Sequence, residues 1–337
     1  HSSIARGRLS SSPLPRMTSM TEEDDKRLPK GSEIPGGKDP DRFWIVEKEL
    51  GAGGFGAVYL VRSKNEEEAP GRKYAMKAEI KKEARKHRKL TMEVMVLSEV
   101  HKQQGPGARH FTQMFDHGRE GDTFFLVMEV VGESLDKLRR KRPNKVFSIG
   151  TALITAKQLL EAVEHLHMCK FLHRDIKPEN AAVGTGEKRR LVYILDFGLA
   201  RKFVNDNGEL KTPRHIVGMK GTERYASRNC LRGCEQGRQD DLETWFYTVF
   251  EIMMAEGLPW RRMEGKDAVL SAKDVFFERE SHRGLFSNFP TIKKHFTVIM
   301  DYLGTLKYFD EPDYDFIVKN IEKAMRKSGV DKRTPLD

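Results

Sequence analysis

Short runs of β-branched and aromatic residues in the first part of the chain predict a β-rich region. Gly, Asn and Pro separate these runs, as is typical of strands joined by turns. We expect five strands, at Phe43–Leu50, Ala57–Arg62, Arg72–Glu79, Phe111–Phe115 and Thr123–Glu129. Between the third and the fourth strand, residues 81–100 predict a helix, because helical spacing puts four apolar residues on one face: Leu90, Val94, Leu97 and Val100.

Helical spacing dominates the rest of the chain. Residues 151–168 carry a stripe of apolar side chains, and Leu242–Met254 is nearly all apolar or aromatic, which predicts a buried helix. We therefore expect an α+β fold of two lobes. The first lobe is β-rich and covers residues 41–131, and the second is larger, mainly helical and covers residues 132–328.

The two ends of the chain differ from the lobes in composition. Residues 1–40 begin Arg- and Ser-rich without an acidic residue, continue with the acidic run Thr21–Asp25 and end rich in Gly and Pro. So little apolar surface predicts a disordered tail, and residues 329–337 form a short C-terminal tail. Two alternatives stay open: the basic start also fits an organelle transit peptide, and Met17 or Met20 could be the natural first residue.

The composition of the chain bears on its cellular location and on its binding partners. The chain has 337 residues, a net charge of +10 and no run of about 18 apolar residues, so we expect no membrane span and no membrane partner. The positive charge favours polyanionic partners such as acidic proteins, nucleotides or nucleic acid, although it also serves solubility. We interpret the three cysteines (Cys169, Cys230 and Cys234) as reduced thiols of an intracellular protein, cytoplasmic or nuclear.

A glycine cluster between the first two predicted strands indicates a phosphate-binding hairpin. It follows the pattern G-x-G-x-x-G-x-V, and a strand comes next, whereas a dinucleotide-binding turn would open a helix. Glycines let backbone amides approach phosphate oxygens closely. The candidate ATP-binding residues of this hairpin are Gly51, Ala52, Gly53, Gly54, Phe55, Gly56 and Val58.

A lysine in the third predicted strand is the candidate for binding the α- and β-phosphates. Lys77 follows Ala75 and Met76, and such small and apolar neighbours suit an inward-facing ammonium. A buried cation requires a partner of opposite charge. Glu93, flanked by apolar residues on the next predicted helix, is the first candidate for that partner, and Glu99 is the second.

The most specific motif is His173-Arg-Asp-Ile-Lys-Pro-Glu-Asn180, which fits H-R-D-L-x-x-x-N with one conservative change. Asp175 would accept or orient the proton of a substrate hydroxyl, and Lys177 would stabilise charge on the transferring phosphoryl group. Asn180 would hold one Mg²⁺. Asp196, in the D-F-G sequence after an apolar strand, would hold another. The order and spacing of these residues predict phosphoryl transfer from ATP.

These motifs resemble those of the protein kinase superfamily across residues 43–325. Further segments are similar to the casein kinase I group, and most of all to its tau-tubulin-kinase-like branch: Gly221–Asn229, Gly237–Glu243, Leu258–Trp260 and Leu306–Tyr314. The resemblance implies a protein kinase that uses ATP with Mg²⁺, or Mn²⁺ as a substitute, and phosphorylates protein substrates. The presence of Lys177 in the loop points to Ser and Thr as the modified residues.

The resemblance also implies roles for single residues. Thr222 would contact the catalytic aspartate and lysine, and Asp241 would brace the catalytic loop. Met128 falls at the gatekeeper position. The backbones of Glu129 and Val131 fall where the adenine edge is read.

Two basic residues are implied to face the substrate. Arg214 matches an arginine that helps bind a phosphate or an acidic side chain, and Lys220 adds charge near the substrate groove. We therefore expect acidic or already phosphorylated protein substrates, no requirement for nucleic acid, and a monomer. The segment Asp196–Arg224 has threonines only at 212 and 222 and no serine, so phosphorylation there is not an obvious switch.

Two other functions stay open. A pseudokinase scaffold would bind partners without turnover, although such proteins normally lack a catalytic lysine, aspartate or glycine that this chain retains. A small-molecule phosphotransferase of related fold is opposed only by resemblance, because Gly221–Asn229 and Asp240-Asp241 are similar to parts of a protein-substrate groove. The basic run Lys81–Lys89 could also be a nuclear-import or nucleic-acid patch, but a solvated helix face is the simpler interpretation.

Overall fold

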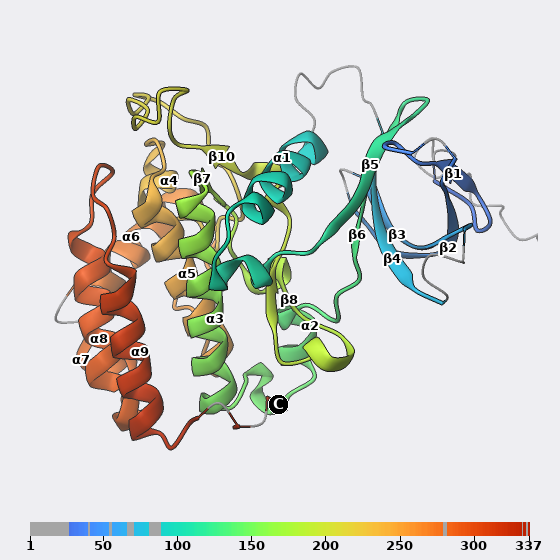
Figure 1. Ribbon diagram of the computed structural model, residues 1–337. Helices are drawn as coiled ribbons and strands as arrows, with labels where there is room; N and C mark the ends of the chain where they lie inside the picture. Colours follow the sequence, from blue (N-terminus) through green and yellow to red (C-terminus); the bar gives the residue numbers. More distant parts are fainter. Residues whose placement is uncertain are drawn as a thin grey trace, which may run out of the picture.

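The computed structural model describes residues 27–39, 41–53, 56–65, 71–80, 89–278, 282–331, 333–334 and 336–337. They form two lobes, a smaller one built on a β-sheet and a larger one built of helices (Figure 1). The two-lobed α+β fold expected from the sequence is therefore confirmed. Most of the expected N-terminal tail, Gly54, Phe55 and residues 81–88 of the basic run lie outside the described residues.

The small lobe contains a six-stranded antiparallel sheet in the order β1-β2-β3-β4-β6-β5. Its strands are β1 (Glu33–Pro35), β2 (Phe43–Gly53), β3 (Gly56–Ser63), β4 (Lys73–Ile80), β5 (Met114–Glu120) and β6 (Thr123–Glu129). Four of the predicted strands are confirmed. The bounds predicted for the strand at Phe111–Phe115 are wrong, because Phe111 is buried in the core beneath the sheet and pairing with β6 begins at Met114.

An edge strand forms inside the expected N-terminal tail, so the prediction of disorder is wrong there. Strand β1 pairs with β2 and buries Ile34. The next residues are fixed by the buried carboxylate of Asp116 in β5, which accepts hydrogen bonds from the N–H groups of Gly37 and Lys38, both at 3.1 Å. The same carboxylate accepts the indole N–H of Trp44 at 2.8 Å. Local composition does not reveal a partner so distant in the sequence.

Helix α1 (Lys89–Lys102) lies between the sheet and the large lobe (Figure 1). Its predicted apolar face is buried at Leu90, Leu97 and Val100, while Val94 is half-buried. The buried carboxylate of Glu79, near the end of β4, accepts the N–H of Leu90 at 2.9 Å. This bond satisfies one of the N–H groups that a helix start leaves without an internal partner.

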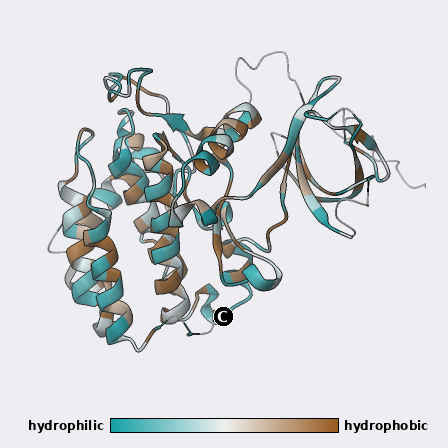
Figure 2. Cartoon of the chain, viewed as in Figure 1, coloured by the Kyte–Doolittle hydropathy of each residue, from teal (hydrophilic) through white to brown (hydrophobic). Residues whose placement is uncertain are grey.

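The large lobe is built around two buried helices, α3 and α5. Its helices are α2 (Leu135–Arg140), α3 (Ile149–Met168), α4 (Arg228–Arg232), α5 (Arg238–Met253), α6 (Lys266–Phe277), α7 (His282–Leu285), α8 (Pro290–Thr305) and α9 (Tyr314–Lys327). Apolar and polar positions alternate around the outer helices α8 and α9 (Figure 2), because only their inner faces are buried. The segment Pro143–Met168 is long and apolar enough to span a membrane, but most of α3 is buried inside this lobe.

Helix α5 confirms the predicted buried helix and begins at Arg238, before the predicted Leu242. The carboxylate of Asp240 accepts the N–H of Gly237 at 2.7 Å and so caps the helix start. Every later residue of α5 is buried, including Asp241. A buried carboxylate needs hydrogen-bond donors, and Asp241 finds them in the loop described next.

Candidate active site

A cavity of about 440 Å³ lies between the glycine hairpin and the large lobe. It brings together most of the predicted ATP-binding and metal-binding residues: Gly51, Ala52, Gly53, Gly56, Val58, Lys77, Asn180 and Asp196. Residues that the sequence did not predict to bind ATP or metal also line it, namely Ala57, Ala78, Glu79, Lys89, Leu90 and Glu179. Glu79, Lys89 and Leu90 belong to the junction of β4 and α1, and only the fold shows that this junction faces the cavity.

The glycine hairpin joins β2 to β3. Gly56 has a φ of +146°, and a Cβ there would lie 2.0 Å from the carbonyl oxygen of Ala78. Only glycine fits at this position. The hairpin backbone therefore lies close against β4, the strand that carries Lys77. Gly54 and Phe55, between Gly53 and Gly56 in the sequence, are outside the described residues.

Lys77 forms the predicted ion pair with Glu93. Its Nζ lies 2.5 Å from Glu93 Oε2 and 3.1 Å from Asp196 Oδ1. The alternative partner, Glu99, pairs instead with Lys102 on α1. Burial alone would lower the pKa of Lys77, but the negative charges of Glu93 and Asp196 raise this pKa above its ordinary value. The ammonium is therefore firmly charged, as binding of phosphate oxygens requires.

The connector between the lobes carries the predicted gatekeeper and adenine-edge residues. Met128 lies opposite Ala75 in the sheet register, and both side chains are buried. Val131 follows β6, and its N–H donates no hydrogen bond within the described part of the chain, which leaves it available to a ligand. Neither Met128 nor Val131 is among the residues that line the 440 Å³ cavity, so their contact with adenine stays a prediction.

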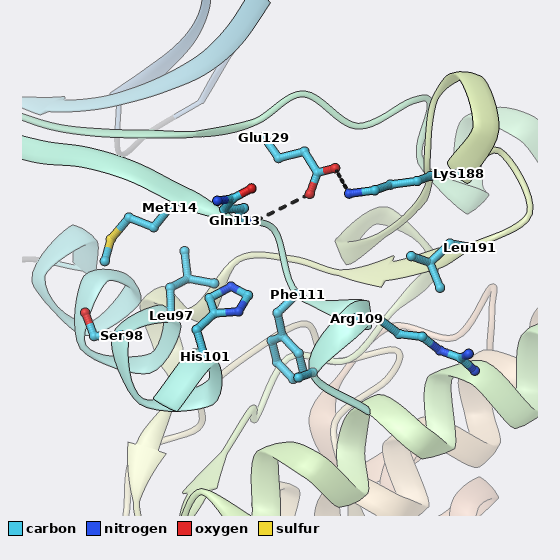
Figure 3. A pocket seen from close by; sticks show the side chains of 11 residues that line it. Leu97, Ser98, His101, Arg109, Phe111, Gln113, Met114, Glu129, Lys188 and Leu191 are labelled. Carbon is cyan, nitrogen blue, oxygen red and sulfur yellow. Dashed lines mark hydrogen bonds and ion pairs between the residues drawn. The ribbon is translucent and has the colours of Figure 1, made fainter. Parts of the chain in front are cut away.

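The side chain of Glu129, at the end of β6, links the small lobe to the large lobe (Figure 3). Its carboxylate accepts hydrogen bonds from Lys188 Nζ at 2.5 Å and from the hydroxyl of Tyr193 at 3.2 Å, both in the large lobe. It also accepts the N–H of Gln113 at 3.4 Å. The sequence suggested only a backbone role for Glu129, because Lys188 is far away along the chain.

The carboxylate of Asp175 is held on both oxygens. Oδ1 accepts the N–H and the hydroxyl of Thr222, each at 3.0 Å. Oδ2 accepts Lys177 Nζ at 2.8 Å and Asn180 Nδ2 at 3.0 Å. Lys177 Nζ also donates to Thr222 Oγ1 at 2.6 Å. The structure thus brings together the four predicted catalytic residues of this region, while their roles in catalysis stay predictions.

Asp241, the predicted brace of the catalytic loop, binds backbone N–H groups of that loop. Its carboxylate accepts the N–H of His173 at 2.6 Å and of Arg174 at 2.8 Å. His167 on α3 donates to it from Nε2 at 3.0 Å. Arg174 has a φ of +68°, a strained backbone that the two hydrogen bonds help to maintain.

Asp196 sits at a sharp turn with a φ of +65°. The next residue, Phe197, is buried and packs against Phe111 and His173, with ring centroids 5.6 and 5.3 Å apart. Burial of Phe197 in the core turns Asp196 toward Lys77 and the cavity. The phenylalanine of the D-F-G sequence is therefore accommodated here by an aromatic cluster.

Asn180 and Asp196 suit a magnesium ion. Both line the cavity, and half of the Asp196 side chain is exposed. Asn180 directs its NH₂ group to Asp175, which leaves the amide oxygen as the free donor atom. Carboxylate and amide oxygens are ligands that Mg²⁺ accepts. The residues therefore fit the ion that the sequence predicts.

Glu235, an acid that the sequence did not single out, forms ion pairs with two arginines beside the catalytic loop. Glu235 is buried, forms an ion pair with Arg214 through Nε, and accepts a second bond from Arg214 at 3.1 Å. Arg201 Nε lies 3.4 Å from the same carboxylate. The side chain of Lys220, by contrast, is exposed. Arg214, predicted to bind a substrate anion, is thus already bound to an internal one.

Comparisons with known proteins agree with this geometry. The protein kinase domain model matches residues 44–324. The serine/threonine-protein kinase spe-6 of Caenorhabditis elegans is 34% identical over 321 residues, which cover 94% of this chain and 81% of that protein. A protein of Dictyostelium discoideum named as a probable serine/threonine-protein kinase is 35% identical over 298 residues, which cover 87% of this chain and 56% of that protein.

Asp241→Asn tests the brace. One amide oxygen would face three donors, so we expect the free energy of unfolding at pH 7 to fall by about 3 kcal/mol. Because the catalytic loop loosens, we expect kcat to fall about tenfold or more. Chemical denaturation and initial rates measure the two effects. Glu256→Gln, which changes an exposed carboxylate, is the control and should alter neither.

The same variant should change the pH dependence of stability. Burial raises the pKa of Asp241, but the hydrogen bonds and charge of His167 and the loop N–H groups lower it below its ordinary value. The stability it contributes is therefore present above the pKa of the unfolded state, about 4, and is lost as the pH falls through the lower folded value. The difference in melting temperature between the two proteins should shrink below pH 4, and a constant difference down to pH 2 would contradict this.

Proposed function

We propose that this chain, which belongs to the protein kinase family and is a serine/threonine-protein kinase, is a continuously active enzyme of the casein kinase I type that prefers acidic or phosphorylated protein substrates. The proposal of continuous activity rests on the contacts between the predicted catalytic residues. The Lys77–Glu93 pair and the network around Asp175 are both complete, and they are formed entirely by groups of the chain itself.

The chemistry follows from how these groups are held. When bound, ATP supplies the phosphoryl group and Mg²⁺ neutralises its charge. Lys77 would bind phosphate oxygens, and Asn180 and Asp196 would hold the metal. Asp175 orients the substrate hydroxyl and accepts its proton, while Lys177 stabilises negative charge beside it. The protein has little covalent chemistry to perform, so correct positioning of the reacting groups supplies most of the rate enhancement.

Continuous activity is supported by the position of Glu235. Its carboxylate pairs with Arg201 and Arg214, next to Arg174 of the catalytic loop. An anion is thereby built into a basic cluster that would otherwise repel itself. Since the charge is supplied by a glutamate, no phosphate is needed to bring these arginines together.

Preference for acidic or phosphorylated substrates is supported by the charges that remain exposed. An arginine has five N–H donors, and Glu235 uses two of those of Arg214, whose side chain is 49% exposed. Lys220 is exposed in the same segment of the chain. A phosphate or carboxylate on the substrate can therefore bind Arg214 from the solvent side.

The finer family assignment and the cellular setting belong to the same proposal. The segments Gly221–Asn229 and Leu306–Tyr314 support similarity to the tau-tubulin-kinase-like branch. The three cysteines are free, two of them buried, which supports an intracellular protein, cytoplasmic or nuclear. We propose that the chain acts as a monomer and requires no nucleic acid.

Labelling with γ-³²P-ATP and Mg²⁺ tests the proposed activity on casein or an acidic peptide. We expect steady incorporation by the native chain and a loss of about a hundredfold or more in Asp196→Ala, because the metal loses its charged ligand. Equal labelling by both proteins would refute catalysis at this site. A partner-binding scaffold would give no turnover with either protein, and a small-molecule enzyme would consume ATP only after metabolites are added.

Arg214→Ala tests the substrate preference. We expect kcat/KM for a phosphorylated or acidic peptide to fall about tenfold, the loss of one charge-assisted contact, with little change for a neutral peptide. Arg189→Ala, at an exposed position on a turn of the large lobe, is the matched control. An unchanged ratio of the two peptides in Arg214→Ala would show that this arginine serves only Glu235.

A further inference from the structure

A fully buried lysine lies behind the segment that carries Thr222. Lys273 on α6 has an exposed fraction of 0%, and among the described residues no carboxylate forms an ion pair with it. A buried charge without such a partner is costly. The active site does not use Lys273 directly, so its cost calls for another explanation.

The ammonium of Lys273 is satisfied by backbone and by aromatic rings. It donates to the carbonyl oxygen of Glu223 at 2.9 Å and to that of Ala226. It also lies 5.0 Å from the ring centroid of Tyr247 and 5.2 Å from that of Trp260, a distance at which ring faces attract cations. Burial lowers the pKa of Lys273 to about 8, so the group is still mainly charged at neutral pH.

Trp260 holds the same segment at a third point. Its indole N–H donates to the carbonyl oxygen of Arg224 at 2.7 Å. Three carbonyls between residues 223 and 226 are thus fixed by two buried side chains. The turn closes on Thr222, whose own carbonyl accepts the N–H groups of Tyr225 and Ala226 at 2.9 and 2.8 Å.

On the other side of this turn, Thr222 contacts the catalytic groups. Its N–H and hydroxyl both bind Asp175, and its oxygen accepts Lys177. Gly221, just before it, has a φ of +86°, and a Cβ there would lie 2.6 Å from the carbonyl oxygen of Arg174. The turn therefore lies directly on the catalytic loop, and a shift of its backbone would move Thr222 against Asp175.

We infer that Lys273 is a positioning residue for phosphoryl transfer: by fixing the carbonyls of Glu223 and Ala226, it holds Thr222 in the geometry that orients Asp175 and Lys177. This inference goes beyond the proposed substrate preference and does not depend on it. Lys273 touches neither the ATP cavity nor Lys77, Glu93 or Asp196. Its loss should therefore change the rate of transfer and leave nucleotide binding unchanged.

The test compares Lys273→Met with Lys273→Gln in the full chain. Both side chains are uncharged and of similar length, but only glutamine can donate to the two carbonyls. We expect Lys273→Met to lower kcat about tenfold or more, with the Kd of an ATP analogue within about twofold of the native value. Lys273→Gln should recover part of kcat. Lys266→Met, an exposed lysine of the same helix, should behave as the native chain.

A second variant covers the case in which Lys273→Met does not fold. Trp260→Phe keeps an aromatic ring but removes the N–H that binds Arg224, so we expect the same pattern with a smaller loss, about threefold in kcat. The inference is overturned if folded Lys273→Met retains kcat within twofold. It is also overturned if glutamine is no better than methionine, or if nucleotide affinity falls in parallel with kcat. Either of the last two results would indicate a purely structural role.

Discussion

The buried carboxylate of Asp241 accepts two successive backbone N–H groups of the catalytic loop, and the geometry of the reacting groups depends on this contact. The bonds to His173 and Arg174 hold a strained backbone in place immediately before Asp175. Because Asp241 sits in the first turn of a helix whose residues from Gln239 onward are all buried, the loop is held by the rigid core of the large lobe. The position of Asp175, the predicted proton acceptor, is thus set by packing of the backbone and not by a flexible side chain.

The other predicted catalytic groups are held by acidic and basic side chains that lie on different elements. The Lys77–Glu93 pair joins the sheet to α1, and Asp196 adds the large lobe to the same cluster. A separate ion pair between Glu129 and Lys188 also connects the lobes (Figure 3). Glu235 supplies a permanent negative charge to the arginines beside the catalytic loop. Together these contacts describe a site whose parts are assembled by the chain itself.

The sequence predicted the groups whose identity and spacing define the chemistry. Asp175, Lys177 and Asn180 lie within six residues of one another, and Glu93 could be preferred over Glu99 because apolar neighbours flank it. The structure brings these groups together as expected because the constraints on them are local, while their roles in catalysis stay predictions. The two lobes were also predictable, since strand and helix periodicities differ.

The features that the sequence missed all depend on contacts between distant segments. Asp116 orders part of the expected N-terminal tail from 78 or more residues away, and no local pattern marks it. In the sequence Lys273 looks like an ordinary helix lysine, and only the fold shows that it is buried against backbone carbonyls. Glu235 likewise reads as a surface acid, although it is buried between two arginines. Side-chain burial of charge is a property of the fold, so it could not be read from composition or spacing.

The central claim is that the site is assembled without phosphorylation, and the time course of transfer by phosphate-free chain tests it most directly. The chain would be treated with a protein phosphatase, freed of it, and shown by intact mass to carry no phosphate before γ-labelled ATP and casein are added. We expect full initial velocity with no lag. A lag that shortens as the chain labels itself, or a velocity near background until it does, would show that the site needs phosphorylation to assemble.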